Sequence, residues 1–283
     1  MNAEYIRRIE ITHLWGQHDI SWTLRPDVNI LSGVNGIGKS TLINLLNAIL
    51  KNASKGTFRS ELTGATVRLY YEPAEADSIR YDVIRSFDRP LVSGDALGRL
   101  SDHNVKTELD LQLYHLQRRY LDYQVNVSNR IIDYLQDNSD ESRQKALEAG
   151  TPRRTFQDTI DRLFRETGKR LDRTHNEIAF LLPNGQRLAP YQLSSGEKQI
   201  LVILLTVLIQ DCQPYTLLMD EPEISLHVEW QQQLIGCIRQ LNPHAQIILA
   251  THSPALIMDG WLDAVTEMSD ITHSEPQAPA QQP

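Results

Sequence analysis

The segment that decides the fold reads Gly33-Val34-Asn35-Gly36-Ile37-Gly38-Lys39-Ser40-Thr41. It fits the pattern G-x-x-x-x-G-K-[ST]. The segment 28–31 before it is expected to form a strand, and the strongly apolar segment 39–50 after it is typical of a helix. A strand, a glycine-rich turn and a helix in this order predict an α/β fold in which the turn binds phosphate groups.

The chemistry of this loop follows from its residue types. Glycines let successive backbone N–H groups point at phosphate oxygens, and the helix amino terminus adds a positive dipole end. Lys39 supplies a cation for the β- and γ-phosphates of ATP, and Ser40 offers a hydroxyl to Mg²⁺. The alternative is a glycine turn with a chance lysine. We predict nucleotide contacts from Gly33, Asn35, Gly36, Ile37, Gly38, Lys39, Ser40 and Thr41.

A second motif joins an apolar strand to two acids, in the sequence Leu217-Leu218-Met219-Asp220-Glu221-Pro222. Open α/β sheets bind ligands at the carboxyl ends of their strands. We expect Asp220 to hold Mg²⁺, through water, and Glu221 to act as the general base on the attacking water. An acidic strand end is common in proteins, so this motif gains its meaning from the phosphate loop upstream.

Two further segments complete the set. In Leu193-Ser194-Ser195-Gly196-Glu197-Lys198-Gln199, a serine precedes a helix whose first turn carries an acid. These residues make an adequate helix cap, which is the simpler interpretation. A helix amino terminus also offers donors to an anion. In Leu249–Pro254, His252 follows a buried strand and could be an ordinary core residue.

Together, the four motifs resemble those of ABC-type ATPases of the RecF, SMC and OLD group, above all the stand-alone bacterial AAA-family members that read DEPEISLH and THSP. The resemblance covers the first fifty residues and those from Leu193 to Pro254. It implies a mixed sheet with flanking helices, a homodimer or higher oligomer that forms with ATP, and hydrolysis at a composite interface. There, a signature made of Ser194, Ser195, Gly196 and Glu197 in one copy touches the γ-phosphate held by the other.

The resemblance also assigns the remaining motif residues. His252 matches the switch histidine that contacts the γ-phosphate and the attacking water, so Glu221 and His252 are the implied catalytic pair, while Ser40 and Asp220 are the implied metal ligands. The segment Glu223–His227 matches the one that crosses the dimer seam. Position 228 is a valine in this chain, whereas proteins of this group often have proline there. A Q-loop glutamine cannot be placed, because the candidate glutamines lie in a helical insertion. These are Gln112, Gln117 and Gln124.

Hydrophobic patterning predicts the organisation of the chain. We expect an N-terminal lobe over 1–98, a helical insertion over 99–175, a C-terminal lobe over 176–273 and a disordered tail over 274–283. Strands are expected at 5–13, 20–24, 28–31, within 67–87, at 215–219 and at 246–250, with a hairpin at 179–187. Helices are expected after Ser195 and over 227–241.

The insertion is the least typical part. Apolar residues at steps of three and four between Leu109 and Tyr134 predict a long helix, 137–152 is polar and predicts a connector, and 156–171 predicts a second helix. This hairpin either packs on the domain or projects as an arm that grips a partner. The segment from Arg143 to Arg173 contains nine basic and five acidic residues. They could bind DNA, RNA or an acidic protein, or pair at helical spacing, as Asp158–Arg162 and Asp161–Arg165 would.

Composition limits the remaining possibilities. The net charge of -8 argues against a general nucleic-acid coat, and Cys212 and Cys237 form no CxxC pair, so neither a zinc hook nor a disulfide framework is expected. We find no signal-peptide core in Met1–Arg8, and the apolar run Ile200–Ile209 is too short to span a bilayer. We therefore expect a cytoplasmic protein without membrane insertion.

The biological role implied by the resemblance is an ATP-dependent switch in DNA maintenance or antiviral defence, with a separate effector such as a nuclease. The chain ends soon after the histidine motif, so the Toprim nuclease domain of full OLD proteins is not expected within it. Two alternatives stay open: the energising subunit of a membrane transporter, and a scaffold that binds ATP without hydrolysing it. The intact Glu221 and His252 argue against the scaffold.

Overall fold

The computed structural model describes residues 1–52, 57–85, 105–137 and 139–274. The chain forms two compact units. Unit 1 comprises 1–85, 214–222 and 244–283, and unit 2 comprises 86–213 and 223–243. The division crosses the predicted lobe 176–273, whose segments 214–222 and 244–273 belong to unit 1. Of the predicted tail, Ser274 ends a strand, and 275–283 lie outside the described residues.

Unit 1 contains an antiparallel sheet in which β1 is central. Its isoleucines at positions 6, 9 and 11 are fully buried, as expected for strand residues that face a core. The strands follow the order β13-β2-β1-β5-β4. Their bounds are β1 (Tyr5–Leu14), β2 (His18–Thr23), β4 (Thr57–Arg59), β5 (Thr66–Glu72) and β13 (Thr272–Ser274).

The second sheet of unit 1 is parallel and has the order β12-β3-β11-β10-β6. All six residues of β11 are buried, because parallel strands are covered on both faces and read as continuous apolar runs. The strands are β3 (Val28–Ser32), β6 (Tyr81–Arg85), β10 (Tyr215–Asp220), β11 (Ala245–Ala250) and β12 (Val265–Glu267).

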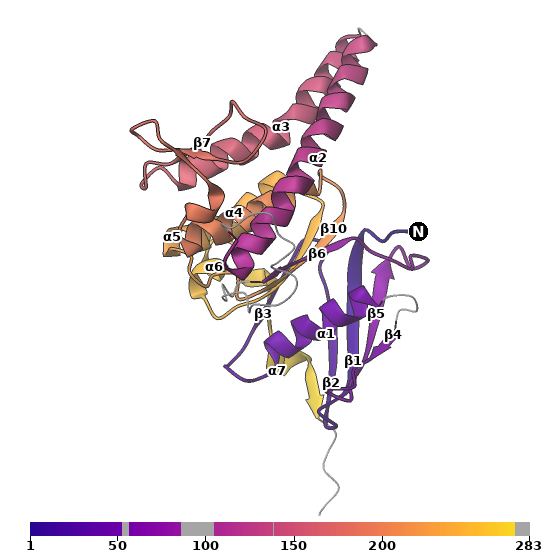
Figure 1. The fold of residues 1–283 in the computed structure, drawn as a ribbon. Helices are drawn as coiled ribbons and strands as arrows, with labels where there is room; N and C mark the ends of the chain where they lie inside the picture. The colour runs from indigo at the N-terminus through magenta and orange to yellow at the C-terminus, as the bar shows by residue number, and fades with distance from the viewer. Residues whose placement is uncertain (53–56, 86–104, 138, 275–283) are drawn as a thin grey trace, which may run out of the picture. The chain divides into compact units, whose positions relative to one another are not determined.

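Helix α1 (Lys39–Lys51) connects the two sheets of unit 1 into one core (Figure 1). Its buried face, which includes Leu42 and Leu46, shares a cluster with Ile9 of β1 and with Leu218 and Ile248 of the parallel sheet. The amino terminus of α1 is therefore fixed with respect to the ends of β10 and β11. The short elements that follow β11 are α6 (Pro254–Met258), η3 (Leu262–Ala264) and α7 (Met268–Ile271).

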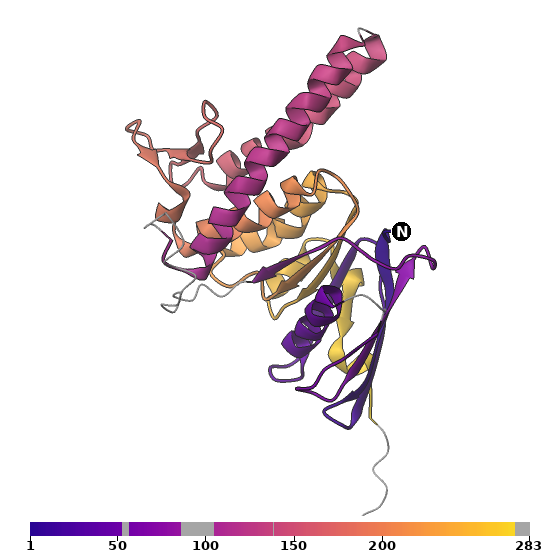
Figure 2. The ribbon, with the colours of Figure 1, turned by 45° about the vertical axis from the view of Figure 1, so that its right-hand side comes forward.

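Unit 2 is built around a helical hairpin and a buried helix. In Figures 1 and 2, α2 (Glu108–Gln136) and α3 (Asp140–Leu163) run side by side as the predicted hairpin. The helix α4 (Ser195–Ile209) is buried at every position from 196 to 208, and from Ile200 onward it is almost entirely apolar, as expected for a central helix. The remaining elements are β7 (Arg170–Leu171), β8 (Phe180–Leu181), β9 (Arg187–Leu188), η2 (Pro190–Gln192) and α5 (Val228–Leu241).

The predicted connector over 137–152 is wrong, because α3 begins at Asp140 and continues through Pro152. Ser139 caps this helix by accepting a hydrogen bond from the Ser142 N–H at 3.1 Å, and an exposed Lys145–Glu141 ion pair of 2.6 Å supports its first turns. The predicted second helix also ends earlier than expected, at Leu163, and 170–171 form β7 instead.

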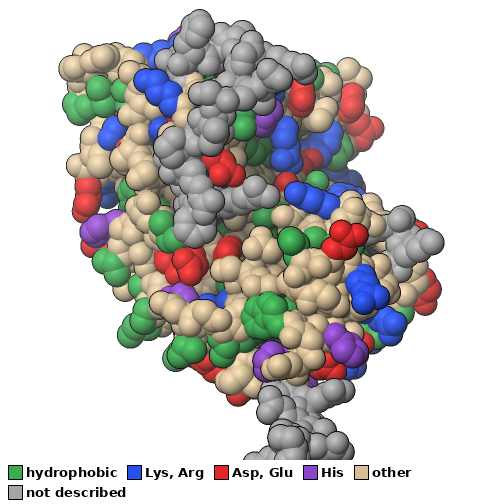
Figure 3. Space-filling model, turned by 60° about the horizontal axis from the view of Figure 1, so that its bottom comes forward, with side chains coloured by type: hydrophobic (Ala, Val, Ile, Leu, Met, Phe, Trp, Pro, Cys, Tyr) green, Lys and Arg blue, Asp and Glu red, His purple; other side chains and the backbone are tan. Residues whose placement is uncertain are grey.

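Some basic residues of the insertion form ion pairs. Arg143–Asp140 and Lys145–Glu141 have helical spacing, whereas Lys169 and Arg173 pair with acids more distant in the sequence. Arg173 donates to Asp158 at 2.7 Å and to Asp161 at 2.6 Å, so the predicted Asp158–Arg162 and Asp161–Arg165 pairs are wrong. Among the described residues on the face in Figure 3, acidic and basic side chains are interspersed, with no single large field of either sign. Contact with DNA or RNA through this insertion stays a prediction.

Within the described ranges, none of the helices is both long enough and apolar enough to cross a bilayer.

Candidate nucleotide site and signature segment

The parallel sheet of unit 1 places three motifs at one edge. Its register sets Asp220 of β10 opposite Ala250 of β11, and Ala250 opposite Leu31 of β3. Each of these strands is followed by a motif: the phosphate loop after β3, Glu221 after β10, and His252 after β11. Parallel strands have their carboxyl ends at the same edge, so residues far apart in sequence meet there.

The phosphate loop is contacted by its own lysine and by an aromatic neighbour. The buried Lys39 amine donates to the carbonyl oxygens of Gly33 at 2.8 Å and Val34 at 3.1 Å. Gly38 caps α1 with a φ of +109°, and a Cβ at this position would lie 2.7 Å from the ring of Trp15. Only glycine satisfies both the backbone angle and the contact with Trp15.

Ser40 and Asp220 are brought into direct contact. The Ser40 hydroxyl donates to Asp220 Oδ1 at 3.0 Å. Burial raises the pKa of the Asp220 carboxyl above its ordinary value, the Ser40 hydrogen bond opposes this rise, and the neighbouring Glu221 adds to it. A hydroxyl and a carboxylate are hard oxygen ligands, and Mg²⁺ is usually held by one or two such groups together with water and phosphate oxygens. The donor set therefore fits Mg²⁺.

Glu221 and His252 face each other at the same edge. His252 Nε2 lies 3.6 Å from Glu221 Oε1. Glu221 adopts a φ of +47°, and its N–H donates to the Ala250 carbonyl at 2.8 Å, which fixes the turn after β10 to the end of β11. A non-glycine residue in this left-handed region is uncommon and often marks a functional site.

A cavity of about 490 Å³ lies between the phosphate loop, Glu221 and His252, and its lining does not include Gly33, Ile37 or Asp220. Its size lies within the range of small-molecule sites. The lining comes from both the phosphate loop and the strand ends. It consists of Asn35, Gly36, Gly38, Lys39, Ser40, Thr41, Glu221 and His252.

The signature segment lies in unit 2 and begins α4 with a capping box. Ser194 Oγ accepts from the Glu197 N–H at 3.4 Å, and Glu197 Oε2 accepts from both the N–H and the hydroxyl of Ser194 at 3.0 Å. The capping interpretation of these residues is thus correct. The N–H groups of Ser195 and Gly196 belong to the first helical turn, where intrahelical acceptors are lacking.

Gly196 is required by a close contact inside unit 2. A Cβ at this position would lie 2.3 Å from the carbonyl oxygen of Ser225, which itself has a φ of +71°. The turn that contains Ser225 is held by Gln231, whose side-chain amide donates to the Leu226 carbonyl at 2.9 Å. The signature and the segment Glu223–His227 are therefore packed backbone to backbone.

Sequence reasoning missed the residues that support these motifs. Trp15 lies in the β1–β2 turn and gives no sequence signal beyond being an aromatic residue in a turn. Lys169 and Thr167 contact Glu197, and Asp110 contacts Lys198. Lys169, Thr167 and Asp110 all belong to the predicted insertion, far from the signature in sequence. The three insertion glutamines lie on α2 as expected, so the position of a Q-loop glutamine stays open.

Two curated relatives share sequence with the chain. The "Retron Vc95 probable ATPase" of Vibrio cholerae serotype O1 biovar El Tor is 31% identical over 115 residues, which are 37% of this chain and 21% of that protein. The "Septu protein PtuA" of Bacillus thuringiensis is 21% identical over 301 aligned residues, covering 89% of this chain and 72% of that protein. The chain therefore matches only about a fifth of the length of the retron relative.

Solved structures and the family comparison concern the fold and the family of the chain. The SMC head bound to the C-terminal winged-helix domain of ScpA has a TM-score of 0.50 at 16% identity, covering 90% of this chain and 91% of that one, which shows the fold. Residues 28–259 match the family described as "AAA domain, putative AbiEii toxin, Type IV TA system". Because this match covers more than half of the chain, the chain belongs to that family, and its recognition as a P-loop ATPase of the RecF, SMC and OLD group is confirmed.

Proposed function

We propose that the protein is a Mg²⁺-dependent ATPase whose active site forms between two copies. The observation that carries this proposal is the meeting of the phosphate loop, Glu221 and His252 around one cavity in unit 1, where the lining residue Ser40 is hydrogen-bonded to Asp220. The helix amino terminus at Ser194 in unit 2 supplies the second half, since its first-turn N–H groups suit an anion. The signature of one copy would close over the nucleotide held by the other.

The chemistry follows from the roles of these side chains. The loop N–H groups and Lys39 bind the phosphates, and Ser40 with Asp220 hold the Mg²⁺, which when bound neutralises phosphate charge. Glu221 accepts a proton from the attacking water while the oxygen of that water forms a bond to the γ-phosphorus. The bond from that phosphorus to the β–γ bridging oxygen breaks, and ADP leaves. His252, whose Nε2 lies 3.6 Å from Glu221 Oε1, would contact the same water and the γ-phosphate.

For the biological role, we infer an ATP-gated switch in antiviral defence or DNA maintenance that controls a separate protein effector such as a nuclease. The retron and Septu relatives and the family description support this direction. This role is an inference from family membership, which is weaker than one from site chemistry. We place the protein in the cytoplasm on the same grounds.

Mixed pairs of inactive copies test the composite site. Lys39→Ala removes the main phosphate cation, and Ser194→Arg blocks the signature, so each variant alone should be inactive. A mixed pair retains one site made of an intact phosphate loop from the Ser194→Arg copy and an intact signature from the Lys39→Ala copy. We expect partial ATPase activity on mixing, measured as phosphate release.

The control is a tagged pull-down showing that mixed pairs form under the assay conditions. If mixed pairs form and no activity returns, each copy contains a self-contained site and the composite site is refuted. Intact ATP binding by the Ser194→Arg copy, measured by calorimetry, verifies that its own phosphate loop has not been damaged.

A further inference from the structure

The carboxylate of Glu197 is shared between the signature serine and the turn that follows α3. Its Oε2 accepts from Ser194, as described above, and its Oε1 accepts from the Lys169 amine at 2.9 Å and the Thr167 hydroxyl at 3.0 Å. The Glu197 side chain is 3% exposed and that of Lys169 is 19% exposed. Ser194 is thus connected to the insertion through a single buried carboxylate.

A second buried ion pair joins the same helical turn to α2. The Lys198 amine lies 2.7 Å from Asp110 Oδ1, with side-chain exposures of 10% and 3%. The other Asp110 oxygen accepts from the N–H groups of Lys106 at 3.0 Å and Thr107 at 3.1 Å, which fixes the start of α2. Asp110 therefore ties the amino termini of α2 and α4 together.

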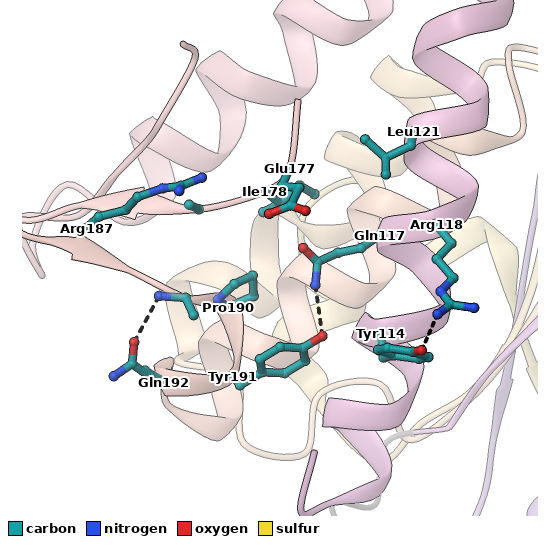
Figure 4. A pocket seen from close by; sticks show the side chains of 12 residues that line it. Tyr114, Gln117, Arg118, Leu121, Glu177, Ile178, Arg187, Pro190, Tyr191 and Gln192 are labelled. Atoms are coloured by element: carbon teal, nitrogen blue, oxygen red, sulfur yellow. Dashed lines mark hydrogen bonds between the residues drawn. The ribbon is translucent and has the colours of Figure 1, made fainter. Parts of the chain in front are cut away.

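Two more contacts extend this connection along α2. The Gln117 side-chain amide donates to the Tyr191 hydroxyl at 3.0 Å, which holds η2 just before the signature (Figure 4). At the far end of α4, Arg130 donates to Asp211 Oδ1 at 2.7 Å. Helix α2 is consequently attached to both ends of the segment that carries the signature.

Buried ion pairs of this kind fix geometry more than they add stability. The cost of desolvating two charges offsets most of their attraction, whereas removing one partner leaves an uncompensated buried charge. Burial by itself would raise the pKa of Glu197, but the hydrogen bonds from Lys169, Ser194 and Thr167 bring it below its ordinary value. Glu197 thus stays ionised because Lys169 and its neighbours are in place, and an ionised Glu197 can hold Ser194.

We propose that Lys169 and Asp110 are positioning residues of the composite ATPase site. Lys169 acts through Glu197, and Asp110 acts through Lys198, to set the place of Ser194 and of the first-turn N–H groups of α4. The inference rests on the proposed function, because those donors serve the nucleotide bound by the facing copy. Through these contacts the helical insertion influences hydrolysis of the nucleotide that is bound by the facing copy.

The test places Lys169→Met on one or the other member of the mixed pair described above. On the Lys39→Ala copy, which supplies the working signature, we expect the phosphate-release rate to fall at least about tenfold, since a displacement of about 1 Å can cost up to about 10²-fold. On the Ser194→Arg copy, which supplies only the phosphate loop, we expect no change. A general loss of folding would instead reduce activity in both placements.

Two further variants test whether the positive charge next to Glu197 is what matters, and whether loss of any lysine from the insertion has the same effect. Lys169→Arg retains the cation toward Glu197 and should keep most of the activity on the signature copy. Lys145→Met removes a lysine from an exposed ion pair with Glu141 on α3 and should be silent in both placements. ATP affinity, measured by calorimetry on the phosphate-loop copy, should be the same throughout, so that only the turnover rate moves.

The outcomes discriminate between the inference and its premise. Loss on the signature copy alone, with rescue by arginine, supports the positioning role. Equal loss in both placements, or loss in neither, overturns it while the composite site stands. An inactive parent mixture in which mixed pairs form refutes the composite site itself, and the positioning role with it.

Discussion

Gly196→Ala is the sharpest single change that the structure offers. The new Cβ would lie 2.3 Å from the Ser225 carbonyl oxygen, which is 1.1 Å short of the 3.4 Å at which ordinary contact begins. Both groups belong to packed backbone, so α4 and the turn at Ser225 must separate by about that distance. Overpacking of this kind costs about 1–3 kcal/mol of unfolding free energy. A displacement of about 1 Å next to Ser194 should also reduce the hydrolysis rate about 10²-fold.

Gly236→Ala provides a matched control in the same unit. Gly236 lies inside α5, and no atom lies within 4 Å of the Cβ that alanine would add. This change should stabilise the protein by about 0.5–1 kcal/mol, because alanine loses less backbone entropy in a helix than glycine. Thermal melts and phosphate-release rates of both variants give the comparison. A Gly196→Ala protein that melts and hydrolyses ATP like the parent would refute the contact with Ser225.

Two further predictions concern the general base and an acid-sensitive turn. Glu221→Gln should bind ATP but hydrolyse it about 10²–10⁴-fold more slowly, since the base is lost, and the trapped nucleotide should hold two copies together in light scattering. An unchanged mass at full ATP occupancy would count against the sandwich. Asp172 accepts hydrogen bonds from Thr174, which lower its pKa from 3.8 to about 2. Because the pKa of Asp172 is lowered, its ionised form stabilises the fold at pH values above 3.8. The melting temperature of the parent should therefore exceed that of Asp172→Asn at neutral pH, and this difference should shrink as the pH falls from about 5 to about 2. A difference independent of pH would contradict this assignment.

The parallel sheet and its motifs could be predicted because each is a local pattern. Apolar runs of four to six residues followed by glycine, acid or histidine identify β3, β10 and β11 and the groups at their carboxyl ends. Parallel pairing then brings those groups together without further information. The α/β fold class with its helical hairpin was predictable for the same reason, and it is confirmed.

The first half of α3 was missed although its signals were present. Ser139 followed by Asp140 and Glu141 is a helix start, and Glu141 with Lys145 has the spacing of a stabilising pair. The scarcity of apolar residues and Pro152 outweighed them. Ion pairs between residues distant in sequence could not be predicted, because nothing in the local sequence of Asp158 or Asp161 indicates Arg173 as the partner.

The signature shows why capping and function are not competing explanations. The capping box accounts for Ser194 and Glu197, since it would stabilise any helix that began with them. It does not account for Gly196, because alanine is the better helix former and only the Ser225 carbonyl excludes it. Nor does a cap need Lys169 or Thr167 on the second oxygen of Glu197. The features that exceed a cap are those that hold the helix amino terminus in a fixed place, which is what a donor to another copy's phosphate requires.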